Sequence, residues 1–207
     1  MIPVIAGAFL AAAAAMETVS APKWTSVRLA ELAERFRAWN HERSMSLARA
    51  AAEDPEDWDA VGPLYYEAIM DLRGWELDIG REFGLPVLGI GGARVVFRLD
   101  EDRVLKLPYG ADSSEGTDFN QYEMQLFQNA SPTLLEWLVP VLDADPDGEW
   151  LIMAFAEDVK QVPGHVVQAL RAMPDAPKDL IFENFGLFNG RVMLRDYAPP
   201  PLWGGRA

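Results

Sequence analysis

Residues 179 to 196 hold the side chains whose types and spacing are best suited to chemistry. Asp179 is followed five positions later by Asn184, and two short apolar segments then lead to a second carboxylate, Asp196. A carboxylate can accept a hydroxyl proton, and an Asn with an Asp can hold Mg²⁺ against the oxygens of a phosphate donor. The spacing therefore predicts a site suited to phosphoryl transfer. The alternatives are a helix cap at Asp179 and a local turn at Asp196.

A lysine and a glutamate earlier in the chain could complete such a site. Strand alternation puts Lys106 on one face with Val104 and Pro108. Glu123 falls on the apolar face of a helix predicted over residues 119 to 128. Burying a lone carboxylate is costly, so we expect Glu123 to have a cationic partner. Lys106, on the predicted strand that precedes this helix in the chain, is the nearest candidate. The alternative for Lys106 is an exposed edge strand.

Three glycines precede these residues, Gly89, Gly91 and Gly92. A glycine-rich turn lets backbone N–H groups approach a phosphate because no Cβ stands in the way. Taken alone, the segment predicts an ordinary turn, because glycine runs more often simply form turns.

The segments around these residues predict helices first and strands later. Residues 24 to 53 carry apolar side chains at alternating spacings of three and four, which predicts an amphipathic helix. A second long helical segment over residues 54 to 84 should be interrupted at Gly62-Pro63 and end at Gly84. These helices hold no cluster of catalytic residue types, so their aromatic stripes predict packing surfaces.

From residue 85 onward the composition becomes rich in β-branched residues and glycine. The predicted strands cover residues 87–93, 94–99, 104–108, 139–143, 150–155, 185–188 and 191–197. Helices are predicted over residues 119–128 and 162–173, and Asn189-Gly190 is a strong signal for a hairpin turn.

This order of strands, helices and polar residues resembles the protein-kinase-like superfamily, including its compact relatives from bacteria and bacteriophages, over residues 85 to 198. The resemblance implies an α+β fold with an antiparallel sheet and one helix in a kinase-like N-lobe, residues 85 to 158. A much reduced C-lobe, residues 159 to 207, would follow. A helical region, residues 23 to 84, and an apolar N-terminal segment, residues 1 to 22, would precede these lobes.

The same resemblance implies a role for each candidate residue, with ATP and magnesium as the cofactors. The catalytic group would comprise Asp179 as the base, Lys106 on the donor phosphates and Glu123 as the partner of that lysine. The remaining roles are those of a phosphate-covering loop at Gly89, Gly91 and Gly92 and of metal ligands at Asn184 and Asp196.

The chain also departs from the pattern of this superfamily. Pro177-Lys178 stands where many kinases have His-Arg before the catalytic Asp, and Tyr197-Ala198 stands where Phe-Gly follows the metal-binding Asp. Only eleven residues follow Asp196. We therefore expect no activation segment and no helices on which an acceptor substrate could dock.

The overall composition limits the possible functions. The net charge is −14 over 207 residues, which argues against a nucleic-acid-binding protein because neutralising phosphates needs a basic surface. The absence of cysteine excludes disulfides and thiolate catalysis, and two histidines with no cysteine argue against a zinc site. Of the kinds of catalytic chemistry considered, the composition leaves open the one that uses Asp and Glu carboxylates.

Residues 1 to 22 begin with an uncharged apolar run, for which we prefer the interpretation of a peg buried against this chain's own helices or a partner. The run is too short for a transmembrane helix, which takes about 20 apolar residues, and it lacks the basic start of a signal peptide. A processed or membrane-associated leader is the alternative. We expect the protein in the cytoplasm or inside a larger assembly such as a virion, and not secreted.

Two functions compete, and the sequence favours the first slightly. The first is a non-catalytic kinase-like protein, structural or regulatory, in a larger assembly such as a virus particle, as a homo- or hetero-oligomer that contacts protein partners through the peg and the amphipathic helices. The second is a small phosphotransferase that depends on ATP and magnesium. An unrelated α+β binding domain stays open if Lys106 and Asp196 lie far apart.

Overall fold

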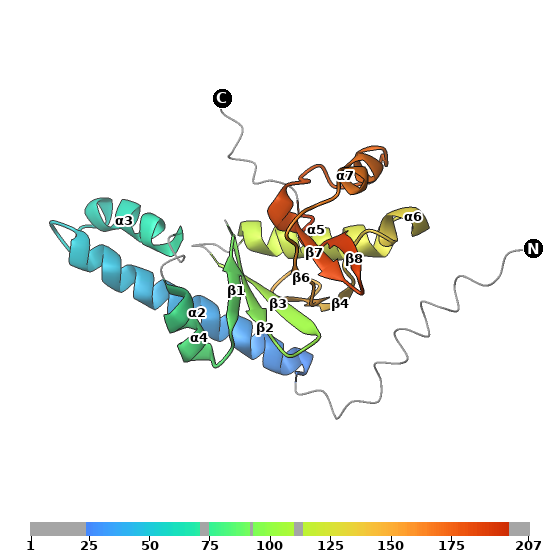
Figure 1. Cartoon of the computed structure of the whole chain (residues 1–207). Helices are drawn as coiled ribbons and strands as arrows, with labels where there is room; N and C mark the ends of the chain where they lie inside the picture. Colours follow the sequence, from blue (N-terminus) through green and yellow to red (C-terminus); the bar gives the residue numbers. More distant parts are fainter. Residues whose placement is uncertain (1–23, 71–74, 92, 110–113, 199–207) are drawn as a thin grey trace, which may run out of the picture.

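The computed structural model describes residues 24–70, 75–91, 93–109 and 114–198 (Figure 1). These residues form an α+β structure with N-terminal helices, a five-stranded antiparallel sheet and a three-stranded antiparallel sheet, with further helices between the strands. The predictions for the apolar segment 1–22 and for Gly92 lie outside the described residues.

The first predicted helix is confirmed as α2, Ser26–Ala51. The hydroxyl of Thr25 accepts a hydrogen bond from the Arg28 amide and caps the start of the helix. The apolar stripe faces inward, since Leu29, Leu32 and Phe36 are all buried.

The second helical segment consists of two helices, α3 (Trp58–Met70) and α4 (Glu76–Phe83). The predicted interruption at Gly62-Pro63 is wrong, because α3 continues through Pro63. A proline at this position has no N–H to donate to the Asp59 carbonyl, so α3 lacks one helical hydrogen bond there. The predicted end at Gly84 is confirmed, with Gly84 in the left-handed conformation that favours glycine.

The five-stranded sheet has the order β1-β2-β3-β5-β4, with every neighbouring pair antiparallel. Its strands are β1 (Val87–Ile90), β2 (Arg94–Arg98), β3 (Arg103–Pro108), β4 (Val141–Ala144) and β5 (Leu151–Ala154). Two helices connect β3 to β4, namely α5 (Ser114–Asn129) and the short α6 (Pro132–Leu135). Helix α5 thus begins earlier than the predicted residue 119.

The three-stranded sheet has the order β6-β7-β8 and contains β6 (Glu157–Asp158), β7 (Phe185–Phe188) and β8 (Arg191–Leu194). Helix α7 (Gly164–Arg171) and the single 3-10 turn η2 (Phe182–Asn184) lie between β6 and β7 in the chain. The hairpin turn is confirmed, with positive φ angles of 49° at Asn189 and 77° at Gly190. The two-residue strand β6 was not predicted.

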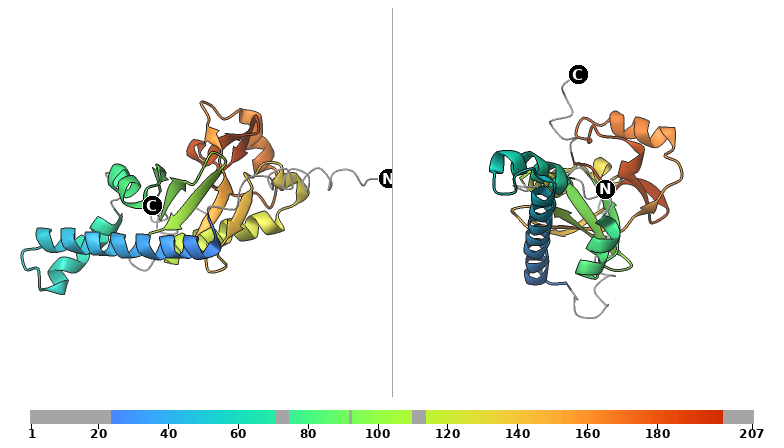
Figure 2. Two further views of the ribbon diagram at one scale, coloured as in Figure 1. Left: turned by 90° about the horizontal axis from the view of Figure 1, so that it is seen from below. Right: turned by 90° about the vertical axis from the view of Figure 1, so that its left-hand side faces the viewer.

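The five-stranded sheet is covered on both faces (Figures 1 and 2). Helices α2 and α4 pack on one face in a single hydrophobic core that includes Phe36 of α2 and Phe97 and Leu105 of the sheet. A second core joins the opposite face to α5, α6, α7 and the three-stranded sheet. Because side chains alternate along a strand, β3 sends Leu105 into the first core and Lys106 to the other face.

None of the helices in the described part of the chain is long and apolar enough to cross a membrane.

Candidate functional site

The predicted pair of Lys106 and Glu123 is present on the second face of the five-stranded sheet. The Lys106 ammonium lies 2.9 Å from Oε2 and 3.0 Å from Oε1 of Glu123. The Glu123 side chain is fully buried, and the Lys106 side chain is 4% exposed. Strand β3 presents the lysine and α5 presents the glutamate, so this ion pair joins the sheet to the helix.

Asp196 joins the same cluster from the end of β8. Its Oδ1 atom lies 3.8 Å from the Lys106 ammonium, which is within ion-pair range. The backbone amides of Tyr197 and Ala198, directly after Asp196, donate hydrogen bonds of 3.0 and 3.3 Å to Glu123. The structure therefore brings together three of the predicted site residues, Lys106, Glu123 and Asp196.

Arg94 is a member of the cluster that the sequence analysis missed. Its guanidinium donates to Asp196 Oδ1 at 2.8 Å and to Glu123 Oε1 at 3.2 Å, and it lies 3.1 Å from Glu123 Oε2. A further hydrogen bond of 3.2 Å reaches Asn120 of α5. With 6% of its side chain exposed, Arg94 is as deeply enclosed as Lys106.

A sequence signal for Arg94 did exist. In the β2–β3 hairpin Val96 pairs with Lys106 and Arg94 pairs with Pro108, so alternation puts Arg94 on the same face as Lys106. The hairpin register, which the sequence analysis did not work out, would have been enough to find it.

The four charges of this cluster, two positive and two negative, balance one another. Burial raises the pKa of the Asp196 carboxyl, but the positive charges of Lys106 and Arg94 outweigh this effect and hold the pKa well below its usual range. Burial lowers the pKa of Arg94, and the charges of Glu123 and Asp196 more than compensate, so its pKa is raised. Asp196 and Arg94 are therefore both charged at neutral pH.

The hydrogen-bonding capacity of the Lys106 ammonium is used within the protein. An ammonium group has three protons to donate. Three acceptors lie at 3.0 Å or less, namely both carboxylate oxygens of Glu123 and the backbone carbonyl of Arg195. A phosphate oxygen would have to displace one of these acceptors.

Asp179 and Asn184 lie together in the loop before β7. The Asn184 side-chain amide donates to the Asp179 carbonyl at 2.9 Å and to the Asp179 carboxylate at 3.1 Å. The Asn184 carbonyl accepts from the amides of Arg195 and Asp196, at 2.8 and 3.2 Å, so this loop is attached to the end of β8. The backbone thus brings Asn184 next to Asp196.

The described part of the glycine-rich segment forms a tight turn between β1 and β2. The Gly91 amide donates to the Arg94 carbonyl at 2.9 Å, and the Tyr109 hydroxyl donates to the Gly91 carbonyl. A Cβ atom at Gly89 would meet nothing within 4 Å, so its surroundings do not require glycine. The Gly91 amide is already bonded and does not face a ligand site as a free donor.

The arrangement does not fit ATP and magnesium as it stands. The Lys106 protons, the Gly91 amide and the Asn184 amide all have partners within the protein. The Asp196 oxygen nearest the cluster carries the guanidinium of Arg94. Within the described residues, no three His, Cys, Asp or Glu side chains are grouped so that they could hold a metal ion. A phosphate group could bind the Lys106 ammonium or the Gly91 amide only if one of these contacts were broken, and a metal at Asp196 Oδ1 would have to displace Arg94.

Comparisons of the chain with protein-family models, with curated proteins and with solved structures found no match.

Proposed function

We propose that this chain is a kinase-like protein without catalytic activity, a pseudokinase, that serves as a structural or regulatory component of a larger assembly such as a virus particle. In this proposal the five-stranded sheet with α5 corresponds to a kinase-like N-lobe, and α7 with the three-stranded sheet corresponds to a much reduced C-lobe. The observation that carries the proposal is the contact between Arg94 and Asp196.

An ion pair at Asp196 opposes metal binding for an electrostatic reason. A magnesium ligand needs a carboxylate whose negative charge is available to the metal. Arg94 donates to Asp196 at 2.8 Å and is itself held by Glu123 and Asn120, so its position is fixed from several sides. A permanently charged guanidinium therefore occupies one oxygen of the carboxylate that a metal would use and offsets its negative charge.

The alternative is an active phosphotransferase that depends on ATP and magnesium, and the Lys106–Glu123 pair favours it. A lysine held by a helix glutamate is the arrangement that the resemblance implies for a nucleotide-binding enzyme. The Asp196 side chain is also 41% exposed, so solvent reaches part of the carboxylate. In this alternative Arg94 would swing away when the nucleotide binds.

Isothermal titration calorimetry with ATP separates these functions. The full chain is titrated with ATP in the presence of magnesium and, separately, with EDTA in place of the metal. We expect no magnesium-dependent binding. Binding that depends on magnesium and is lost in Asp196→Asn would overturn the pseudokinase proposal and establish the alternative. Lys178→Ala, an exposed lysine next to Asp179, is the matched control.

The role in an assembly needs a separate measurement on the N-terminal apolar segment. Sedimentation velocity of the full chain should show species larger than a monomer, and Phe9→Asp with Leu10→Asp should shift them toward the monomer because charge opposes burial of this segment. A full chain that stays monomeric, with sedimentation unchanged by the two substitutions, would contradict this part of the proposal.

A further inference from the structure

A cavity outside the ion-pair cluster is formed where α7 faces the loop before β7. It has a volume of about 500 Å³, which is within the range of small-molecule sites. The residues that line it are Lys160, Gln161, Val162, Val167, Leu180, Phe182 and Phe185. None of the four charged residues of the cluster contributes to the lining.

Five of the seven residues that line this cavity are apolar, and exposed apolar side chains continue outward from it. Phe182 is 48% exposed although it lines the cavity, and Ile181 beside it is 51% exposed. Large apolar side chains at this exposure, grouped around a cavity, mark a binding surface more often than isolated exposed residues do. In Figure 1 this part of the molecule lies at α7 and β7, away from the N-terminal helices.

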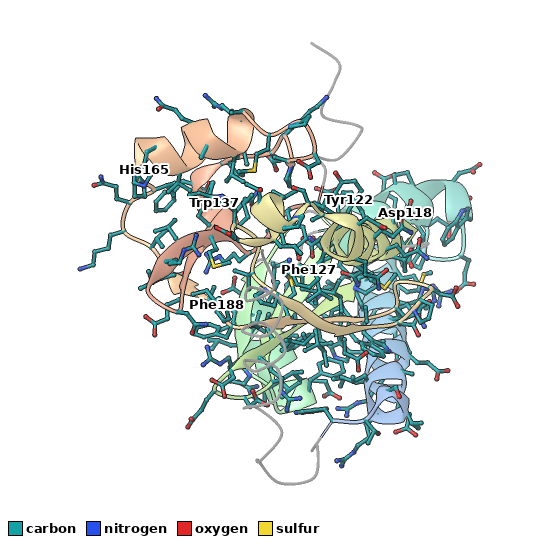
Figure 3. The ribbon with its side chains drawn as sticks, turned by 90° about the vertical axis from the view of Figure 1, so that its right-hand side faces the viewer. Asp118, Tyr122, Phe127, Trp137, His165 and Phe188 are labelled. Atoms are coloured by element: carbon teal, nitrogen blue, oxygen red, sulfur yellow. The ribbon has the colours of Figure 1, made fainter. Side chains whose placement is uncertain are left out.

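The cavity also contains one cationic group, the exposed ammonium of Lys160. Among the residues that the structure describes, no carboxylate forms an ion pair with Lys160 and no acceptor forms a hydrogen bond with its ammonium. The neighbouring Asp158 is paired with Arg195 at 2.6 Å and so is not free to neutralise it. The other polar lining side chain, Gln161, carries no charge. Figure 3 shows His165 at the exposed start of α7, and this residue does not line the cavity.

We propose that this cavity binds a small amphipathic anion, whose apolar body packs against Val167, Leu180 and Phe182 and whose acidic group meets Lys160. Apolar lining side chains beside a single cation suit this class of ligand, because the apolar contacts contribute affinity and the charge fixes the orientation. The inference does not rest on the pseudokinase proposal, since it uses none of the residues of the ion-pair cluster.

The test compares two fluorescent probes that share an aromatic body. The sulfonate 8-anilinonaphthalene-1-sulfonate carries the negative charge, and N-phenyl-1-naphthylamine lacks it. Both are titrated against the wild-type full chain and against three variants, Lys160→Ala, Val167→Trp and Lys178→Ala. Circular dichroism and thermal unfolding establish that each variant is folded as the wild type is.

We expect the sulfonate to bind more tightly than the neutral probe. Lys160→Ala should weaken the sulfonate by about three- to fivefold, the size of an exposed ion pair, and leave the neutral probe unchanged. Val167→Trp should weaken both probes by about tenfold or more because the larger side chain fills the cavity. Lys178→Ala, which removes an exposed lysine outside the lining, should change neither.

Three results would overturn the inference. The first is equal binding of the two probes, and the second is an equal loss in Lys160→Ala and Lys178→Ala, which would indicate a general charge effect. The third is unchanged binding in a folded Val167→Trp variant, which would place the probes elsewhere on the apolar surface. If Val167→Trp does not fold, the test rests on the binding of the two probes to the wild type and to Lys160→Ala. The Lys160 side chain is exposed, so this substitution should not affect folding.

Discussion

The two faces of the five-stranded sheet are both covered by apolar cores, but one of them, the charged face, also carries buried ionic side chains. One face carries Phe97, Leu105 and similar side chains, which pack against Phe36 and other apolar residues of α2 and α4. The other face carries Arg94 and Lys106. The same alternation along β2 and β3 produces both faces, so adjacent residues in the sequence belong to very different environments.

Apolar and charged side chains on these faces contribute to stability in different ways. An apolar core loses stability in proportion to the atoms removed and the cavity left behind. Removing one member of a buried group of balanced charges has a different effect, because its partners stay charged and lose the opposite charge that stabilised them. The buried charges therefore fix the position of α5 and of the segment after β8, whereas the apolar side chains on both faces supply the general stability of the sheet.

The largest effect is expected from Glu123→Ala on the charged face. This change leaves Arg94 and Lys106 buried with only Asp196 to balance them, and it removes the acceptor of the Tyr197 and Ala198 amides. We expect the free energy of unfolding, measured with urea, to fall by about 3–5 kcal/mol. Glu34→Ala, an exposed glutamate of α2, is the control and should change it by less than about 0.5 kcal/mol. A loss below 1 kcal/mol for Glu123→Ala would contradict the stabilising role of Glu123 in the ion-pair cluster.

A somewhat smaller loss is expected from Leu105→Ala on the apolar face. Leu105 is completely buried beside Lys106 in the chain, so the two residues compare the faces at neighbouring positions. Urea unfolding should show a loss of about 3 kcal/mol from the cavity and the lost transfer energy. Leu105→Met nearly preserves the volume and should cost under about 1.5 kcal/mol. Equal losses for the two variants would argue against tight packing on this face.

A third comparison concerns two glycines with positive φ, Gly148 at 80° and Gly190 at 77°. A Cβ at Gly148 would lie 2.3 Å from the Thr117 carbonyl oxygen of α5, whereas a Cβ at Gly190 would meet nothing within 4 Å. Gly148→Ala should cost about 2–3 kcal/mol, because it adds a backbone clash to the strained φ angle and disturbs the position of α5. Gly190→Ala should cost about 1 kcal/mol. Thermal unfolding of both variants measures the difference, and equal shifts would contradict the close approach.

The smallest effect is a change in acid stability at Asp196. The two cations hold the folded-state pKa of Asp196 below its unfolded-state value, so its contribution is present above about pH 4 and is lost as the pH falls below this value. The carboxylate is 41% exposed, so this contribution is at most about 1 kcal/mol. Asp196→Asn should therefore be less stable than the wild type at pH 7, with the difference shrinking toward pH 2. A difference that does not change with pH would exclude this ionisation.

The sequence was sufficient for the parts of the molecule that follow from periodicity and charge compensation. Alternation and the cost of burying Glu123 predicted its pairing with Lys106, and the Asn189-Gly190 turn predicted the last hairpin. Arg94 was missed because its role depends on hairpin register, which pairs it with Pro108, fourteen positions away, and so puts it on the same face as Lys106.

Other features could not be read from the sequence because longer contacts decide them. Strand β6 has only two residues and exists because Glu157 and Asp158 pair with β7, almost thirty positions later. Helix α3 continues through Pro63 because its packing against α2 tolerates one missing hydrogen bond. The roles implied for Asp179, Asn184 and the glycines stay predictions.

Electron paramagnetic resonance with Mn²⁺ tests most directly whether Arg94 keeps metal away from Asp196. Free and bound Mn²⁺ are measured with ATP present, for the wild type and for Asp196→Asn, so that weak binding to the acidic surface cancels between the two proteins. Our account predicts indistinguishable binding curves, because the Asp196 carboxylate is already paired with Arg94 at 2.8 Å. Tighter Mn²⁺ binding by the wild type that is lost in Asp196→Asn would contradict it.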